Sequence, residues 1–239
     1  MNIDYVKTPF TNNPSMTRLE GPAYNQNPNE RYLAEKQKQL DLNGQKLFGE
    51  TKISKEEYLR EKFLKFCNLN NSFSLLEITT KFEEDFAIMY KGKMEIVSVC
   101  FPSGWIPKEK LGKHLSGIHE PIADSEQLIK ASDKISDYMT KQSIKRWVWT
   151  VTTSNELSNF PDYTKPEIST FENLYFRVET QTTAPIDNIT SIFFIKVDVV
   201  SLAEVWDIRI LESINSMTEE VLNYKNLRQI KELLNRMKV

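Results

Sequence analysis

The chain has 239 residues, of which 40% are apolar, and this is enough to bury an ordinary globular core. Its 31 basic and 33 acidic side chains give a formal net charge of −2, so no global field draws the protein to nucleic acid or to an anionic membrane. No run approaches the ~18 apolar residues of a membrane helix, and the N-terminus lacks the apolar segment of a secretory signal. We therefore expect a soluble, cytoplasmic protein.

The first part of the chain is rich in Asn, Pro and Thr and shows little apolar periodicity. This composition predicts an extended arm over residues 1–28, which orders only where it lies on the body of the protein. A single domain is predicted over residues 29–239.

Helix signals begin directly after this arm. Asn29 is placed to cap a helix over residues 29–40. Ser54 and Glu57 have the spacing of a capping box, ahead of an apolar stripe that starts at Leu59. The pattern predicts two helices before the first strand.

Strand signals follow these helices. Apolar-rich segments over residues 85–90 and 94–101, separated by a short connection with Gly92, predict a β-hairpin. Further strands are predicted over residues 144–153, 174–183 and 191–200.

The remaining segments connect or follow the strands. Ser125 is placed to cap a helix that runs to about Thr140, and residues 159–167 have the composition of a loop. Ser201 and Glu204 again have capping-box spacing, and the last forty residues resemble two helices. The predicted fold class is therefore α+β, with a mainly antiparallel sheet and helices before, between and after its strands.

Several common chemistries lack their sequence signals. There are seven glycines and none after Gly117, so neither a dinucleotide-binding Gly-x-Gly-x-x-Gly loop nor a Walker loop is present. The two histidines are five residues apart and have no Cys cluster beside them, which disfavours a zinc centre. Cys67 and Cys100 are far apart in sequence and are predicted to be buried thiols.

Two basic runs have the spacing of solvated faces. They consist of Lys108, Lys110, Lys113, Lys225, Arg228 and Lys231. His114 lies within the first run and is predicted to be exposed.

The most distinctive segment runs from Cys100 to Pro121 and contains both histidines. It starts with Cys-Phe-Pro-Ser-Gly-Trp, continues through Lys-Leu-Gly and closes with Ile-His-Glu-Pro. Four other segments accompany it along the chain: Glu84-Asp85-Phe-Ala-Ile-Met89, Arg146-Trp-Val-Trp149, Phe176-Arg-Val-Glu-Thr-Gln-Thr182 and Tyr224-Lys225. Over roughly residues 80–230, their order and content resemble the haem-dependent oxidative N-demethylase family, alpha-subunit-like.

The resemblance implies a PAS-like fold that holds haem b and oxidatively removes a methyl group from a small secondary amine. It also implies O2 as a co-substrate and electrons from a flavin or iron–sulfur reductase subunit. The chain itself has no flavin, nicotinamide or iron–sulfur motif, which agrees with a need for external electrons. The absence of Cys-x-x-Cys-His disfavours covalent attachment of the haem.

The resemblance also implies roles for individual residues. His119, in the Ile-His-x-Pro segment, corresponds to the axial iron ligand, with a structural or surface histidine as the alternative. Arg146 and Arg177 are candidates to bind the haem propionates. Trp149 is a candidate wall of the haem site, a refinement of its default role in core packing.

Arg177, Glu179 and Gln181 alternate along a predicted strand and so share one face of it. Such a face is often simply solvated. The family motif favours a pocket instead, in which Gln181 contributes to the lining and Glu179 holds an arginine or a cationic amine.

Three positions depart from the family pattern: Val148 replaces Asn, Thr180 replaces Arg and Thr183 replaces Leu. The exchange at Thr180 removes a charged fork of donors suited to carboxylates. Two alternatives therefore stay open, a PAS-like binding or sensor module that has lost haem or turnover, and a structural subunit of a larger amine-oxidising assembly.

Overall fold

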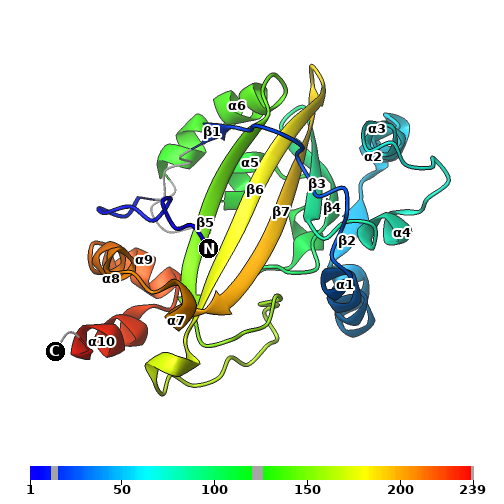
Figure 1. The fold of residues 1–239 in the computed structure, drawn as a ribbon. Coiled ribbons are helices and arrows are strands. Elements are labelled where there is room, and N and C mark those ends of the chain that lie inside the picture. The colour runs from blue at the N-terminus through cyan, green and yellow to red at the C-terminus, as the bar shows by residue number, and fades with distance from the viewer. Residues whose placement is uncertain (12–15, 120–125, 238–239) are drawn as a thin grey trace.

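The computed structural model describes residues 1–11, 16–119 and 126–237, without the side chains of residues 119 and 126–128. Its centre is one antiparallel sheet with the strand order β1-β5-β6-β7-β3-β4-β2 (Figure 1). The strands are β1 (Thr17–Arg18), β2 (Phe48–Glu50), β3 (Asp85–Tyr90), β4 (Lys93–Ser98), β5 (Ile144–Thr152), β6 (Tyr175–Asp187) and β7 (Thr190–Ser201). The predicted fold class is thus confirmed as an α+β fold, a seven-strand antiparallel sheet with N- and C-terminal helices.

The predicted strands are all present, with two corrections to their lengths. β6 and β7 extend to a tight turn, because pairing continues from Tyr175 opposite Ser201 as far as Asp187 opposite Thr190. β4 ends at Ser98, three residues before the predicted end. After it, the backbone N–H of Val99 donates to the carbonyl of Leu47, and those of Cys100 and Phe101 donate to the side chain of Asp85.

The helices before and between the strands are more numerous than predicted. They are α1 (Glu30–Asn43), η1 (Gly44–Lys46), α2 (Lys52–Glu56), α3 (Leu59–Phe66), α4 (Leu75–Thr79), η2 (Pro107–Lys110), α5 (Leu115–His119), α6 (Glu126–Met139) and η3 (Phe171–Asn173). Asn29 caps α1, as predicted. The span of α6 matches its prediction, while the proposed cap at Ser125 lies outside the described residues.

The predicted capping box at Ser54 is wrong. Thr51 caps α2, and Ser54 lies inside that helix. Tyr58 then takes a left-handed conformation with φ of 54°. This conformation separates α2 from α3, which begins at the next residue. The capping box among these helices is at Ser74, whose side chain and backbone pair with Glu77 at the start of α4.

The C-terminal part contains four described helices rather than two. They are α7 (Leu202–Val205), α8 (Ile208–Asn215), α9 (Glu219–Tyr224) and α10 (Arg228–Arg236). Asp207 and Thr218 accept backbone N–H groups and start new helices, and Asn226 with φ of 55° separates the last two. Ser201 precedes α7 but its side chain makes no capping bond.

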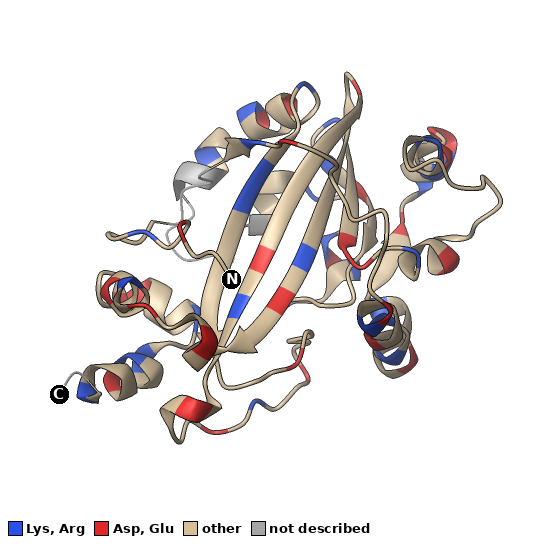
Figure 2. Cartoon of the chain, viewed as in Figure 1, with Lys and Arg blue, Asp and Glu red and all other residues tan. Residues whose placement is uncertain are grey.

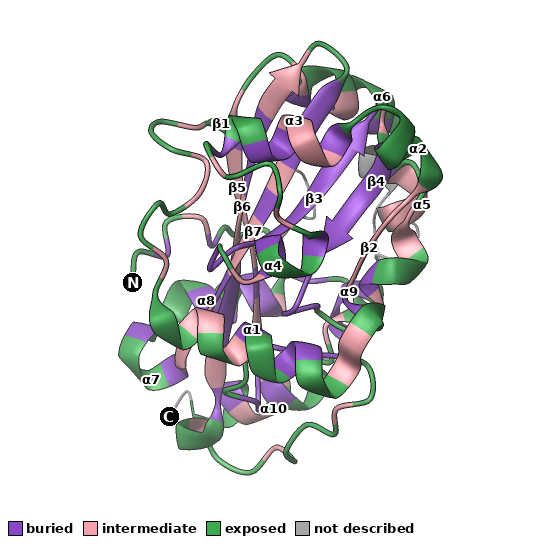
Figure 3. Ribbon diagram, turned by 90° about the vertical axis from the view of Figure 1, so that its right-hand side faces the viewer, coloured by how far each residue is buried: buried purple, intermediate pink, exposed green. Residues whose placement is uncertain are grey.

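The two faces of the sheet are covered differently. We call the side of β5 and β6 that carries Arg177, Glu179 and Gln181 the Glu179 face, and the opposite side the Trp149 face. On the Glu179 face, α5 and α6 pack on the end of the sheet near Phe193. On the Trp149 face, α3 and α4 cover β3 and β7, and the C-terminal helices cover β5 and β6 (Figures 1 and 3).

The N-terminal residues lie on the C-terminal helices. Ile3 and Val6 are buried in the same core cluster as α8 and α9, and Ser213 Oγ donates to the carbonyl of Lys7 at 2.6 Å. The division into an arm over residues 1–28 and a single domain over residues 29–239 stays a prediction. No helix within the described ranges is long and apolar enough to cross a membrane.

Candidate functional site

The alternating residues of β6 lie on one face, as predicted. In the register of β5 and β6, Gln181 is opposite Arg146, Glu179 is opposite Val148 and Arg177 is opposite Thr150. Directly opposite residues of an antiparallel pair share a face. Arg146 therefore belongs to the same face, and the charged positions run across the middle of the sheet (Figure 2).

Arg177 is buried and its guanidinium is occupied by groups of the protein. Its side chain is 2% exposed. Nη1 donates to the carbonyl of Leu157 at 2.5 Å, Nη2 donates to the carbonyl of Phe101 at 3.0 Å, and both Nε and Nη2 donate to Ser103 Oγ. Burial lowers the pKa of Arg177, and the charges of Glu179 and Asp85 oppose that effect. Its role toward a propionate stays a prediction.

Glu179 accepts two hydrogen bonds from neutral side chains. Ser103 Oγ donates to Oε1 at 2.5 Å, and Gln181 Nε2 donates to Oε2 at 2.9 Å. Ser103 therefore belongs to the site, although its sequence context between proline and glycine indicated only a turn. Gly104, the next residue, has φ of 81°, a conformation that favours glycine and turns the chain toward Asn159.

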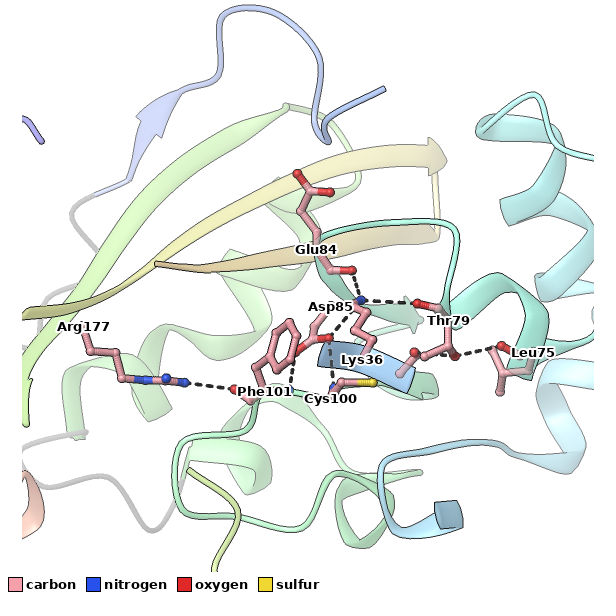
Figure 4. Close-up of polar contacts among 9 residues, drawn as sticks. Lys36, Leu75, Thr79, Glu84, Asp85, Cys100, Phe101 and Arg177 are labelled. Atoms are coloured by element: carbon pink, nitrogen blue, oxygen red, sulfur yellow. Dashed lines mark hydrogen bonds and ion pairs between the residues drawn. The ribbon is translucent and has the colours of Figure 1, made fainter. Parts of the chain in front are cut away.

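A second buried network holds the segment that carries Ser103. Asp85 accepts the backbone N–H of Cys100 at 2.9 Å and that of Phe101 at 2.8 Å. Lys36 Nζ lies 3.1 Å from the Asp85 carboxylate and donates to the carbonyl of Glu84 at 2.5 Å (Figure 4). From Cys100 onward, a carboxylate thus replaces a neighbouring strand as the acceptor of the backbone N–H groups.

Three motifs separated in sequence are thus joined by hydrogen bonds. Asp85 fixes the Cys-x-Pro-Ser segment, whose Phe101 carbonyl and Ser103 hydroxyl then bind Arg177. Sequence reasoning missed Lys36, because a lysine among helix formers gives no sign of burial. The network shows why these residue types occur together.

A further basic group reaches this region from the C-terminal helices. Lys225 follows α9, and its Nζ donates to the carbonyl of Trp149 at 2.9 Å. Burial lowers the pKa of Lys225 to about 8, with Glu179 opposing and Arg146 assisting the shift. The prediction of a solvated face is therefore wrong for Lys225, and the signal for its role was the Tyr-Lys motif.

Arg146 has an unpaired donor. Its Nε is buried and has no hydrogen-bond partner within the part of the chain that the structure describes. Burial lowers the pKa of Arg146 and the charge of Glu179 opposes this.

Trp149 is not brought together with these side chains. It lies on the opposite face, stacked on Phe176 with centroids 5.6 Å apart and in edge contact with Phe10. Its indole serves the core, which is the default role considered for it, and its carbonyl alone meets Lys225. A contact with a cofactor stays a prediction.

The histidines contribute no described metal site. His119 ends α5 and its side chain lies outside the described residues, so its role as ligand stays a prediction. His114 is exposed, as predicted. Within the described ranges no cluster of His, Cys, Asp and Glu could hold a metal ion. Cys67 and Cys100 are free and buried, as predicted, and burial raises the pKa of both thiols.

A small cavity adjoins the site where α5 and α6 meet the Glu179 face. Its volume is about 20 Å³. Its polar lining consists of Arg146, Gln181 and Thr183, and its apolar lining of Met16, Leu115, Ile135, Met139, Ile144 and Phe193. The buried, unpaired donor of Arg146 fits a carboxylate such as a haem propionate, but a cavity this small admits about one water molecule and no macrocycle.

The chain matches the family model described as haem-dependent oxidative N-demethylase, alpha subunit-like, over residues 38–235. This span covers most of the chain, and the protein belongs to that family. No curated protein matches the chain.

Proposed function

We propose that this member of the haem-dependent oxidative N-demethylase family binds haem b and oxidises the methyl group of a small secondary amine. O2 is the oxidant, and a flavin or iron–sulfur reductase subunit supplies the electrons. Membership of the alpha-subunit-like family supports haem as the cofactor and a further subunit as the partner. The observation that carries the proposal is the convergence of the family motifs on Arg146, Arg177 and Glu179.

The residues have separate roles in this proposal. Arg146 is a better candidate than Arg177 to bind a propionate, because its buried Nε lacks an acceptor. The donors of Arg177 already bind two carbonyls and a hydroxyl of the protein. Arg177 then acts mainly as a positioning residue for Ser103 and Glu179. His119 is the proposed axial ligand. Bound haem supplies the redox chemistry that activates O2.

Haem binding also requires space on the Glu179 face. Ligand pockets usually measure roughly 300–1,000 Å³, whereas the cavity beside Arg146 measures about 20 Å³. We infer that α5 and α6 move away from β5 and β6 when haem binds. The contact of Leu115, Ile135 and Met139 with this end of the sheet is apolar, so its separation breaks no described ion pair.

A second candidate function is a binding or sensor module without haem. The closed cavity favours it, together with Val148 and Thr180 at positions where the family has Asn and Arg. In this case the Glu179 face recognises only a small molecule.

The first test is an absorption spectrum of protein expressed with adequate haem supply, recorded before and after dithionite and carbon monoxide. A stoichiometric Soret band that shifts with carbon monoxide supports the haem proposal, and loss of that band in His119→Ala supports the axial ligand. His114→Ala is the matched control and keeps the band. A colourless protein that takes up no haemin refutes the first proposal and favours the binding module.

A further inference from the structure

Positive charges outnumber negative charges around Glu179. Arg146, Arg177 and Lys225 each interact with the charge of Glu179, which is the carboxylate that they share. Within the part of the chain that is described, neither Arg146 nor Lys225 has a carboxylate within ion-pair distance. The site therefore carries an excess of cations at the surface of a hydrophobic core.

Lys225 and Arg146 both have N–H donors that make no described hydrogen bond. Lys225 has three N–H donors and makes one described hydrogen bond, to the carbonyl of Trp149. Its Nζ also lies 5.4 Å from the centroid of the Phe10 ring, which is a contact with no acceptor oxygen. Arg146 has a buried Nε without an acceptor. An unpaired buried donor and an uncompensated cation both raise the free energy of the folded protein. Burial lowers the pKa of both side chains, and the charge of Glu179 opposes the shift in each case.

The two cations come from different parts of the fold, and both are tied to β5: Arg146 belongs to this strand, and Lys225 donates to the carbonyl of its Trp149. Arg146 projects from the strand itself, and Lys225 arrives from the turn after α9. Past Lys145, the outer edge of β5 has no strand partner in the described ranges. A ligand bound at this edge would therefore displace no described strand pairing.

We propose that Arg146 and Lys225 form a binding pair for a carboxylate, and that the ligand of the Glu179 face carries at least one such group. A cationic amine alone is the wrong ligand for this end of the site, since it would add a fourth positive charge beside Glu179. The source of the carboxylate rests on the proposed function: it belongs either to a haem propionate or to an amino-acid-like substrate.

The existence of the pair is tested on the full chain without haem, with acetate as the probe. The melting temperature is followed with acetate or chloride at equal ionic strength. Acetate stabilises the wild type by binding the folded state, and Lys225→Met or Arg146→Met lowers its affinity roughly 10- to 100-fold through the loss of a charged hydrogen bond. Lys225→Arg keeps the charge and retains the effect.

Lys145→Met is the matched control. Lys145 neighbours Arg146 in sequence but is on the opposite face of β5, because it pairs with Thr182 and Arg146 pairs with Gln181. There its Nζ lies 4.9 Å from the centroid of Trp147. The control variant keeps the response to acetate. An equal loss in Lys145→Met, or no difference between acetate and chloride in the wild type, overturns the proposal.

A second arm identifies the source of the carboxylate. If it is a propionate, Lys225→Met weakens binding of haem but not of haem dimethyl ester. If it belongs to a substrate, N-methylglycine stabilises the wild type and N-methylethylamine does not. If neither difference appears, the acetate effect is an adventitious additive only and the proposal fails. Absence of haem binding refutes the proposed function, and the results with acetate and N-methylglycine together then decide whether the pair binds a carboxylate.

Discussion

The protein contains two charged clusters, one buried and one half-buried, that are built in opposite ways. In the first, Lys36 and Asp85 form an ion pair that is fully buried, and each also binds backbone groups. In the second, Arg146 and Lys225 lie near Glu179 without a direct ion pair, and a buried donor of Arg146 has no partner. The first cluster is complete within the chain and the second is not.

This difference separates a structural role from a binding role. A charge that the fold itself neutralises fixes a local conformation, here the path of the chain from Cys100 to Ser103. A charge that the fold leaves uncompensated costs stability and is understandable when a ligand provides the missing partner. Removal of a charge should therefore lower the stability of the protein in the first cluster and should remove a destabilising charge in the second.

The largest effect is expected for Lys36→Met. This substitution leaves the buried carboxylate of Asp85 without its cation, and such a loss costs about 3–5 kcal/mol. The free energy of unfolding from urea titration measures it. Lys38→Met is the control, because Lys38 is 53% exposed and its loss should change the stability by less than about 0.5 kcal/mol. A cost below 1 kcal/mol for Lys36→Met contradicts the distinction.

Arg177→Met should have the next largest effect. The carbonyls of Phe101 and Leu157 lose their charged donor, and a buried acceptor without a partner costs about 1–3 kcal/mol. Urea titration gives the change in stability. The segment from Phe101 to Ser103 should also become less protected against amide hydrogen exchange. Unchanged protection there would contradict the role of Arg177 as a positioning residue.

The sequence predicted the sheet better than the site. The alternation of Arg177, Glu179 and Gln181 is enough to place them on one face, because a strand has a period of two residues. The positions of Lys36 and Lys225 were not predictable in this way, since both contacts depend on the packing of helices far away in sequence. Short polar side chains such as Asp207 also started extra helices where apolar periodicity predicted only two in the last forty residues.

The second cluster should make stability depend on pH. The pKa of Lys225 is about 8 in the folded protein, below its ordinary value of 10.5. Between these values the unfolded chain binds more protons, so the free energy of unfolding contributed by this group rises with pH. Below pH 8 the destabilising effect is complete.

Subtracting the curve of Lys225→Met from that of the wild type isolates this contribution from other groups that titrate at high pH. The difference should grow in favour of the wild type from pH 8 to 10.5. Acetate bound beside Lys225 favours its charged form and should move the rise to higher pH. A flat difference curve would show that Lys225 is not desolvated.

The smallest effect is expected at Thr183, which lines the small cavity beside Arg146. Thr182 and Thr183 are neighbours on β6 and point to opposite faces. Thr182 Oγ1 donates to the carbonyl of Ala23, whereas Thr183 Oγ1 is buried and has no partner in the described structure. Thr182→Val should cost about 1 kcal/mol by removing a hydrogen bond, whereas Thr183→Val should be neutral or slightly stabilising because it removes an unpaired hydroxyl. Thermal unfolding of the two variants compares them directly. A clear loss of stability in Thr183→Val would mean that its hydroxyl holds a partner, most simply a water molecule shared with Arg146 in the cavity that both residues line.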